Sequence, residues 1–164
     1  MNRALVIAFA AAFGVLLGVG GFTFRYAEGL SYLSTDPKAC VNCHIMRPQY
    51  DGWQKASHHA VAVCIDCHLP HDIVGKYWTK LENGYRHSKE FTAQTFAEPI
   101  FVKPRAAEIL QENCLRCHGT LVRELTWTAH DERSQVRCVR CHAGVGHGDA
   151  ARLGGRLLAR ELED

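Results

Sequence analysis

The 164-residue sequence has little net charge, no run of basic residues and no cysteine to spare. Its formal net charge is only +2, which argues against a nucleic-acid partner. The length is enough for one small domain. Every cysteine falls in a Cys-x-x-Cys-His unit, so none remains for a disulfide or a catalytic nucleophile. The eight cysteines are Cys40, Cys43, Cys64, Cys67, Cys114, Cys117, Cys138 and Cys141.

A histidine directly follows the second cysteine of every pair. Two cysteines three residues apart can bond the two vinyl groups of one haem, and the next histidine then lies under the iron as its proximal ligand. Paired cysteines also occur in zinc ribbons, but a zinc site gives no reason for a histidine in all four places. We therefore predict four covalently bound c-type haems. The four histidines are His44, His68, His118 and His142.

The four units form an internal repeat. Their first cysteines are separated by 24, 50 and 24 residues, which predicts two di-haem modules. In each module a tryptophan and then a histidine precede the second unit, Trp53 and His58 in the first module and Trp127 and His130 in the second. The chain has too few apolar side chains for an ordinary core around four haems. We predict a mainly α-helical fold of short helices and loops wrapped around the haems.

An uncharged apolar run occupies residues 4–24 and is bounded by Arg3 and Arg25. As an α-helix these 21 residues would extend about 31 Å, close to the roughly 30 Å of a bilayer's hydrocarbon core. A cleaved signal peptide is the alternative, because two stretches within the run resemble small-residue cleavage sites. The run continues past both, so we predict a single-pass anchor over residues 1–27 and a haem domain over 28–164.

The orientation of the anchor is inferred from the haem chemistry rather than from the flanking charges. Arg3 on one side and Arg25 on the other give almost no positive-inside signal. Because bacteria attach haem c outside the cytoplasmic membrane, the four units predict a domain on the periplasmic side of the inner membrane.

The first unit alone is followed by a methionine, Met46, two residues beyond His44. This spacing places both side chains on the same side of the haem, where they compete for one position on the iron. If Met46 wins, the iron has a soft thioether on one side and an open site on the other. Thioether ligation raises the reduction potential relative to bis-histidine ligation. The first haem is therefore predicted to be the unusual one.

The histidines outside the units are candidate distal ligands for the second, third and fourth irons. Three are needed if all three irons are six-coordinate, and His58 and His147 are the best candidates. If these two are the only ones, a residue of a partner protein must complete one iron; otherwise His130 is the third ligand. The six histidines are His58, His59, His71, His87, His130 and His147.

A helix is predicted over residues 73–88, because Asp72 is a good N-cap and apolar residues then recur every four positions. Tyrosine and tryptophan interleaved with lysine suit a membrane surface. An ordinary surface helix packed on haem is the alternative. The apolar face consists of Ile73, Tyr77, Trp78, Leu81 and Tyr85, and the polar stripe of Lys76, Lys80, Asn83 and His87.

The last part of the sequence is less informative. Residues 106–112 are predicted to form a short helix entering the third unit, and the prolines before it suggest an extended crossing. Residues 149–164 are predicted to form a solvated terminal helix without a site.

The combination of motifs resembles the membrane-anchored tetrahaem quinol dehydrogenases of the NapC/NirT family. The resemblance covers nearly the whole chain: the anchor, the Cys-x-x-Cys-His-x-Met unit at 40–46, Cys64 to Asp72, Lys80, and Cys138 to His147. It implies that menaquinol is oxidised beside the first haem and that electrons pass to a periplasmic multihaem reductase. Within the family the chain resembles the small subunit of cytochrome c nitrite reductase, which implies that the partner is the catalytic subunit of that enzyme, which reduces nitrite to ammonia.

The resemblance also implies roles for single residues. In the family the methionine of the first unit binds its iron, which carries over to Met46, and a lysine near the quinol carries over to Lys80. An acidic residue follows that lysine by seven positions in the family, where this sequence has His87. We hypothesise that His87 takes over that role as proton acceptor or as a weak distal ligand. A different reductase such as nitrate reductase, a stand-alone haem reductase and a passive electron shuttle are the alternatives.

Overall fold

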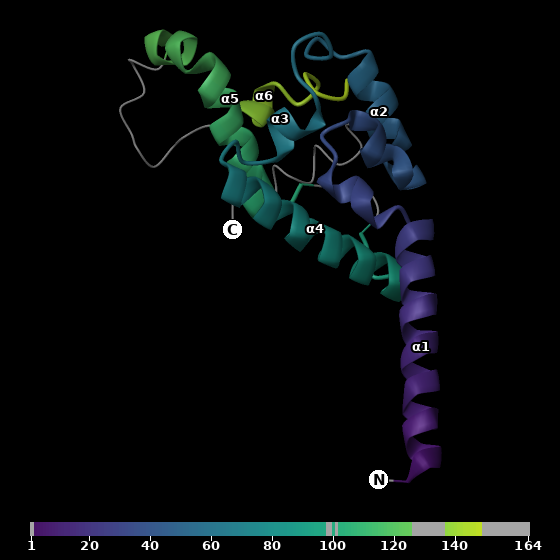
Figure 1. Cartoon of the computed structure of the whole chain (residues 1–164). Helices are drawn as coiled ribbons and strands as arrows, with labels where there is room; N and C mark the ends of the chain where they lie inside the picture. Colours follow the sequence, from purple (N-terminus) through teal and green to yellow (C-terminus); the bar gives the residue numbers. More distant parts are fainter. Residues whose placement is uncertain (1, 98–99, 101, 126–136, 149–164) are drawn as a thin grey trace. The chain divides into compact units, whose positions relative to one another are not determined.

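The computed structural model describes residues 2–97, 100, 102–125 and 137–148. These residues form α-helices, 3-10 helices and loops, with no strand among them, and the prediction of a mainly helical fold is confirmed (Figure 1). The chain divides into two compact parts, which we call the N-terminal part (Met1–Ser34) and the C-terminal part (Thr35–Asp164).

The N-terminal part is built around helix α1, Arg3–Tyr26. Asn2 caps this helix, because its side-chain oxygen accepts a hydrogen bond from the backbone nitrogen of Ala4 at 3.2 Å. None of the 24 residues of α1 is buried, and the helix is long and apolar enough to cross a membrane. A 3-10 helix, η1 (Gly29–Leu33), completes this part. The predicted membrane helix is therefore present, one residue longer at its start and two at its end than the uncharged run.

The C-terminal part of the chain carries all four Cys-x-x-Cys-His units. Asp72 begins its first long helix, because its carboxylate accepts a hydrogen bond from the backbone nitrogen of Gly75 at 2.6 Å, as predicted. The helix predicted over 106–112 belongs to a longer helix that begins at Pro104 and runs through the third unit. In chain order the described elements are η2 (Pro37–Asn42), η3 (His44–Met46), α2 (Arg47–Gln54), α3 (Cys64–His68), α4 (Ile73–Ala93), α5 (Pro104–Leu125) and α6 (Cys138–Cys141).

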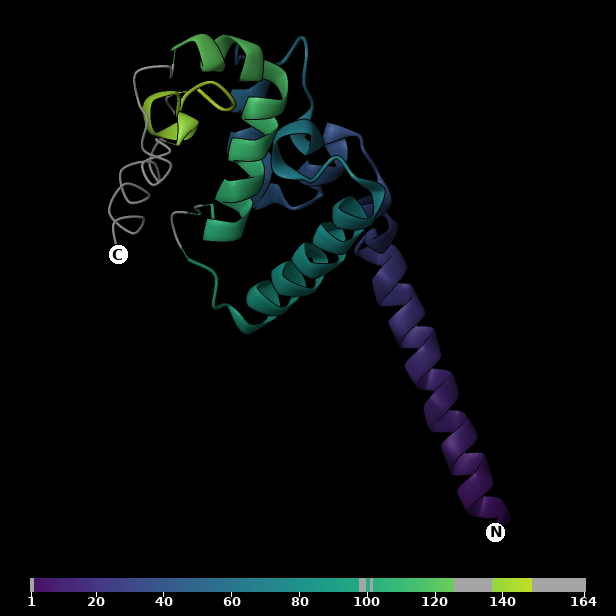
Figure 2. The same ribbon diagram turned by 90° about the vertical axis from the view of Figure 1, so that its left-hand side faces the viewer.

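Helix α5 holds the C-terminal part of the chain together. It packs against α3 and α6 (Figures 1 and 2). On α5 the buried Asn113 donates hydrogen bonds from Nδ2 to the carbonyl oxygens of Cys67 and Leu69, both at 2.9 Å. The buried apolar residues among those described are only Leu69, Ala107 and Ile109. Such a small protein core is what we expected of a domain whose interior is completed by cofactors.

Two ion pairs connect α4 with the start of α5 and the residue before it. Glu82 Oε2 accepts from Arg105 at 2.6 Å, and Glu90 Oε1 accepts from Lys103 at 2.8 Å. Both pairs are partly exposed, so each contributes about 0–1 kcal/mol to stability. Both pairs lie on the polar side of α4.

Candidate haem-binding site

Three of the four Cys-x-x-Cys-His units have a helical backbone. The second unit, Cys64–His68, is helix α3 itself, the third lies within α5, and the fourth forms α6 with His142 as its C-cap. In an α-helix the residues i, i+3 and i+4 share one face, so the two thiols and the histidine project on the same side. This is the arrangement that attachment to two vinyl groups with an adjacent axial ligand requires.

The first unit has a different backbone. It consists of two 3-10 helices, η2 and η3, interrupted at Cys43, which has the extended dihedrals φ −85° and ψ 109°. The shared helical face is therefore not formed here. His44 is exposed and Met46 is partly buried, with the Met46 nitrogen donating to the Cys43 carbonyl oxygen at 2.9 Å. The structure turns Met46, more than His44, toward the interior.

The thiols of successive units lie next to one another, and all eight are free. A hydrogen bond from the Cys64 thiol lowers the pKa of Cys40 to about 7 and raises that of Cys64. The four units are therefore arranged in space in the order in which they occur in the chain. The neighbouring thiols are Cys40 with Cys64, Cys67 with Cys117, and Cys114 with Cys138.

Two histidine pairs have the spacing of axial ligands to one metal. The ring centres of His58 and His118 are 6.0 Å apart, and those of His68 and His147 are 5.9 Å apart. Two imidazoles that bind one iron from opposite sides, each with a metal–nitrogen distance of about 2 Å, have ring centres roughly 6 Å apart. Each pair joins the histidine of a unit to a histidine of the other module. The residues present fit two bis-histidine haems.

His147 is held in an orientation suited to ligation. Its Nδ1 hydrogen-bonds the backbone carbonyl oxygen of Gln49 at 2.7 Å. Such a bond places the proton on Nδ1 and leaves the Nε2 lone pair available for a metal. Gly52, one turn further along α2, permits the approach, because a methyl group there would overlap the carbonyl oxygen of His147.

The partner of His147 is also prepared to bind a metal. Burial away from water is the larger cause and the neighbouring His147 the smaller one, and together they lower the pKa of His68 to about 4. The imidazole of His68 is therefore neutral at pH 7, which is the form that ligates.

The adjacent residues His58 and His59 have different surroundings. His58 faces His118, and its Nδ1 lies 3.2 Å from the Ser57 hydroxyl. His59 instead meets the edge of the Trp53 ring, with centres 4.6 Å apart. Trp53 fixes the loop by donating from Nε1 to the carbonyl oxygen of Ala62 at 3.0 Å. Of the two histidines, His58 is the one brought to a haem unit.

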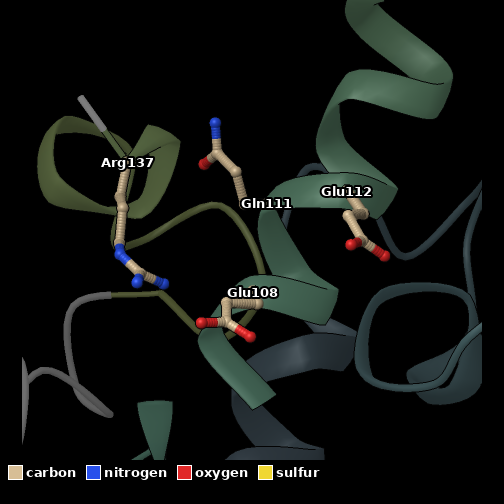
Figure 3. A pocket seen from close by; sticks show the side chains of 4 residues that line it. All are labelled: Glu108, Gln111, Glu112 and Arg137. Atoms are coloured by element: carbon tan, nitrogen blue, oxygen red, sulfur yellow. The ribbon is translucent and has the colours of Figure 1, made fainter. Parts of the chain in front are cut away.

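The surroundings of the fourth unit are described only in part. His142 is exposed, and its predicted partner His130 lies outside the described residues. The backbone nitrogen of Cys138 donates to Gln111 Oε1 on α5 at 2.9 Å, which links the third and fourth units. A cavity of about 210 Å³ lies beside this link, and Figure 3 shows the Arg137 side chain facing α5 across it. Its lining residues are Glu108, Gln111, Glu112 and Arg137.

Lys80 lies beside the first unit. It is only 7% exposed, and its ammonium group is 5.7 Å from the centre of the Tyr77 ring. Burial lowers the pKa of Lys80, while the nearby Cys40 thiolate opposes that shift. A cationic donor is therefore available next to the attachment site of the first haem.

His87 is not brought to the first unit by any contact of the described residues. It is exposed on α4, and its charged neighbours are Arg86, Glu90 and Lys103. Its local packing lowers its pKa, with Arg86 and Lys103 lowering it further and Glu90 raising it. The structure thus places Lys80 and His87 in different environments, although both lie on the predicted polar stripe.

The acidic residues nearest these groups have structural partners. Glu82 and Glu90 form the ion pairs described above. Asp66 caps α3, because its Oδ2 accepts from the backbone nitrogen of Val63 at 2.9 Å. The Nε2 atom of His71 lies 3.4 Å from the Asp66 carbonyl oxygen.

Two contacts of this site were missed by sequence reasoning. The carbonyl oxygen of Gln49 has no side-chain signature, so nothing in the sequence marks it as a partner of His147. Gly52 did carry a signal, since a glycine inside a helix often marks a close approach of another backbone. Asn113 and Gln111, within three residues before the third unit, also carried a signal, because an amide side chain near a haem unit can hydrogen-bond a neighbouring backbone.

The chain is similar to known cytochrome c-type proteins over most of its length. The chain is 38% identical to the cytochrome c-type protein NrfH of Wolinella succinogenes over 93% of each chain. It is 30% identical to the cytochrome c nitrite reductase subunit NrfH of Nitratidesulfovibrio vulgaris, over 90% of this chain and 89% of that relative. The cytochrome c-type protein NapC of Escherichia coli K12 is 28% identical, over 81% of this chain and 80% of the relative.

The fold is similar to a solved structure, the crystal structure of a cytochrome c nitrite reductase NrfHA complex bound to the HQNO inhibitor. The TM-score is 0.60 at 26% identity, covering 88% of this chain and 90% of the matched chain. Residues 1–152 match the family model described as the NapC/NirT cytochrome c family, N-terminal region. Membership of a cytochrome c family implies covalently bound haem c and a role in electron transfer. The chain therefore belongs to the NapC/NirT cytochrome c family.

Proposed function

We propose that this protein is a menaquinol-oxidising electron-transfer subunit that passes electrons through four haems to a periplasmic multihaem reductase. The most direct candidate for that partner is the catalytic subunit of cytochrome c nitrite reductase. The observation that carries this proposal is the match, over nearly the full length of both chains, to proteins named NrfH and to a chain of an NrfHA complex. Helix α1 would anchor the chain in the inner membrane, with the C-terminal part on the periplasmic side.

The histidine geometry supports a definite set of ligands. Met46 would bind the first iron, and His68 with His147 the second. His58 and His118 would bind the third iron. The fourth would take His142 together with either His130 or a residue of the reductase. Because each bis-histidine pair uses one residue from each half of the repeat, the two modules would be cross-linked through the irons.

Lys80 is proposed to bind the quinol. Oxidation of menaquinol to menaquinone releases two electrons and two protons, and the haems, when bound, supply one-electron acceptance. Lys80 is a compact cationic donor beside Cys40 and would hydrogen-bond a quinol oxygen. This interaction would hold the quinol ring at the first haem.

His87 is proposed to take up a proton. It follows Lys80 by seven residues, about 10.5 Å along α4. Its lowered pKa keeps the imidazole neutral at pH 7, and its exposure allows the proton to pass to water. His87 would accept one of the two protons by way of water and release it to the outside, and the second proton would pass directly to water.

A second candidate function is donation to a different reductase. The match to NapC over about four-fifths of both chains favours this possibility. The cytochrome c-type protein TorC of Escherichia coli K12 is also similar, at 28% identity over 83% of this chain and 40% of the relative. The haem and quinol chemistry would be unchanged, and only the surface that meets the reductase would differ.

The test uses the full-length haem-loaded protein in detergent with a menaquinol analogue. Reduction of the haems is followed by absorbance, and a purified multihaem nitrite reductase and nitrite are then added. We expect quinol to reduce the haems and nitrite to reoxidise them only when the reductase is present. If dithionite reduces the haems and quinol does not, the protein is a passive shuttle. If nitrite reoxidises the haems without the reductase, it is a stand-alone reductase.

A further inference from the structure

The orientation of helix α4 is the reverse of that expected for a surface helix. The apolar residues of its first half are 46–80% exposed, whereas Thr79 and Lys80 are buried. In an ordinary amphipathic helix the apolar stripe faces the core and the polar face meets water. The exposed apolar residues are Ile73, Val74, Tyr77, Trp78, Leu81 and Tyr85. We call these six residues the α4 apolar face.

The α4 apolar face is one continuous surface. With 3.6 residues per turn, the six side chains fall within an arc of about 140°. Thr79 lies nearly opposite the centre of this arc, and the ion pairs of Glu82 and Glu90 with the α5 end of the domain lie outside it. The domain therefore holds α4 by its polar side. The outward face contains six of the ten exposed large hydrophobic residues described in the C-terminal part of the chain.

The first haem does not explain the exposure of the whole face, because only the edge with Ile73 and Tyr77 lies next to Lys80. Lys80 marks the side of α4 that faces Cys40, and the centre of the α4 apolar face is turned about a quarter of the helix circumference away. Monomeric soluble domains rarely leave a contiguous apolar patch of this kind uncovered. A further apolar partner is needed.

The length of the chain restricts what that partner can be. Eight residues separate the end of the membrane-spanning α1 at Tyr26 from the C-terminal part, which begins at Thr35. Even fully extended, they reach at most about 29 Å. The C-terminal part is therefore permanently held close to a bilayer surface. The local concentration of lipid is high whether or not a protein partner is present.

The composition of the face fits the lipid headgroup region. Tyr77, Trp78 and Tyr85 are aromatic residues with a polar edge, which concentrate at membrane interfaces. Lys76 and Lys89 lie beyond the two edges of the arc, where their amines can reach the headgroups while their alkyl stems lie along the apolar boundary. We propose that α4 lies in the membrane interface with this face inserted among the lipids, as a second membrane attachment besides α1.

Site-specific photo-crosslinking tests this proposal on the full-length, haem-loaded protein in membranes of phosphatidylethanolamine and phosphatidylglycerol. One variant carries Trp78→benzoylphenylalanine. The matched control carries Leu121→benzoylphenylalanine, at a residue of α5 that is 58% exposed. Mass spectrometry after irradiation should show about tenfold more lipid adduct at position 78 than at position 121.

The possible outcomes separate this proposal from others. Equal adducts at the two positions, or no lipid adduct at position 78, would overturn it. Crosslinking in native membranes that yields a protein adduct instead of lipid at position 78 would show a protein-docking face and also overturn it. If the Trp78 variant loses haem, Tyr85→benzoylphenylalanine serves in its place. The readout needs neither quinol nor reductase, so it is independent of the proposed function.

Discussion

The first and second Cys-x-x-Cys-His units have the same spacing of cysteines and histidine but different backbones. In the second unit a regular helix, α3, places both thiols and His68 on one face. In the first unit the extended Cys43 separates two 3-10 helices, His44 is exposed and Met46 is partly buried. The difference teaches that one motif can present different side chains to the interior, and we expect the backbone conformation to decide which of them binds the iron.

The largest effect is expected from Met46→Leu, which removes the residue that distinguishes the first unit. His44 should then bind the iron, and histidine ligation lowers its reduction potential relative to thioether ligation. Quinol-driven haem reduction should slow by about a hundredfold, equivalent to roughly 2.7 kcal/mol in the barrier. Stopped-flow absorbance measures the rate, and electron paramagnetic resonance should show one changed iron with four haems still attached. A spectrum identical to wild type would rule out Met46 as a ligand.

Gly52→Ala tests the second unit through its proposed distal ligand. The added methyl group would overlap the carbonyl oxygen of His147 and displace this residue from His68. Overpacking of this kind costs about 1–3 kcal/mol. We expect a lower melting temperature and one iron changed from low spin to high spin. Gly119→Ala is the matched control, because nothing lies within 4 Å of a methyl group there. If both variants keep the wild-type spin state, His147 does not depend on this contact.

Lys80→Met tests whether the first unit alone has a quinol donor beside it. Loss of one charge-assisted hydrogen bond should weaken quinol binding about tenfold, or roughly 1.4 kcal/mol. Lys76→Met removes the lysine one turn earlier on α4 and should leave binding near the wild-type value. The measurement is the quinol concentration that gives half-maximal reduction rate, with dithionite reduction as the check on haem content. Equal effects of both substitutions would assign the lysines a general electrostatic role.

The smallest effect is expected at His87, which lies away from the first unit. Its pKa is lowered from the ordinary value of 6.5, so its neutral, proton-accepting form predominates above that pH. The rate of quinol oxidation should be constant above pH 6.5 and should fall as the pH decreases through the lowered pKa. In His87→Gln this inflection should disappear, with a rate a few-fold lower at pH 7. An inflection that persists in the variant belongs to another group.

Much of this architecture could be predicted because its signals are local. The carboxylate of Asp72 and the four-residue period after it predicted the start of α4, and the 21-residue uncharged run predicted α1. The same period showed that α4 is amphipathic but not which face is turned outward. Orientation depends on what surrounds the helix, and periodicity carries no information about that.

Contacts between distant segments were harder to predict. His58 and His147 were ranked above the other histidines, and both lie beside a unit histidine. That each faces a unit of the other module was not foreseeable, because the repeat gives no information on how its halves pack. The carbonyl oxygen of Gln49 was equally hidden, since every residue has one.

The two hydrogen bonds of Asn113 have a consequence for how such chains can change over evolution. This one amide, directly before the third unit, connects α5 to the end of the second unit through protein atoms alone. The spacing between the second and third units is therefore independent of the length of chain that leaves α4 and returns to α5. Insertions within residues 94–103 should be tolerated without altering the distance that electrons must cross between the two modules.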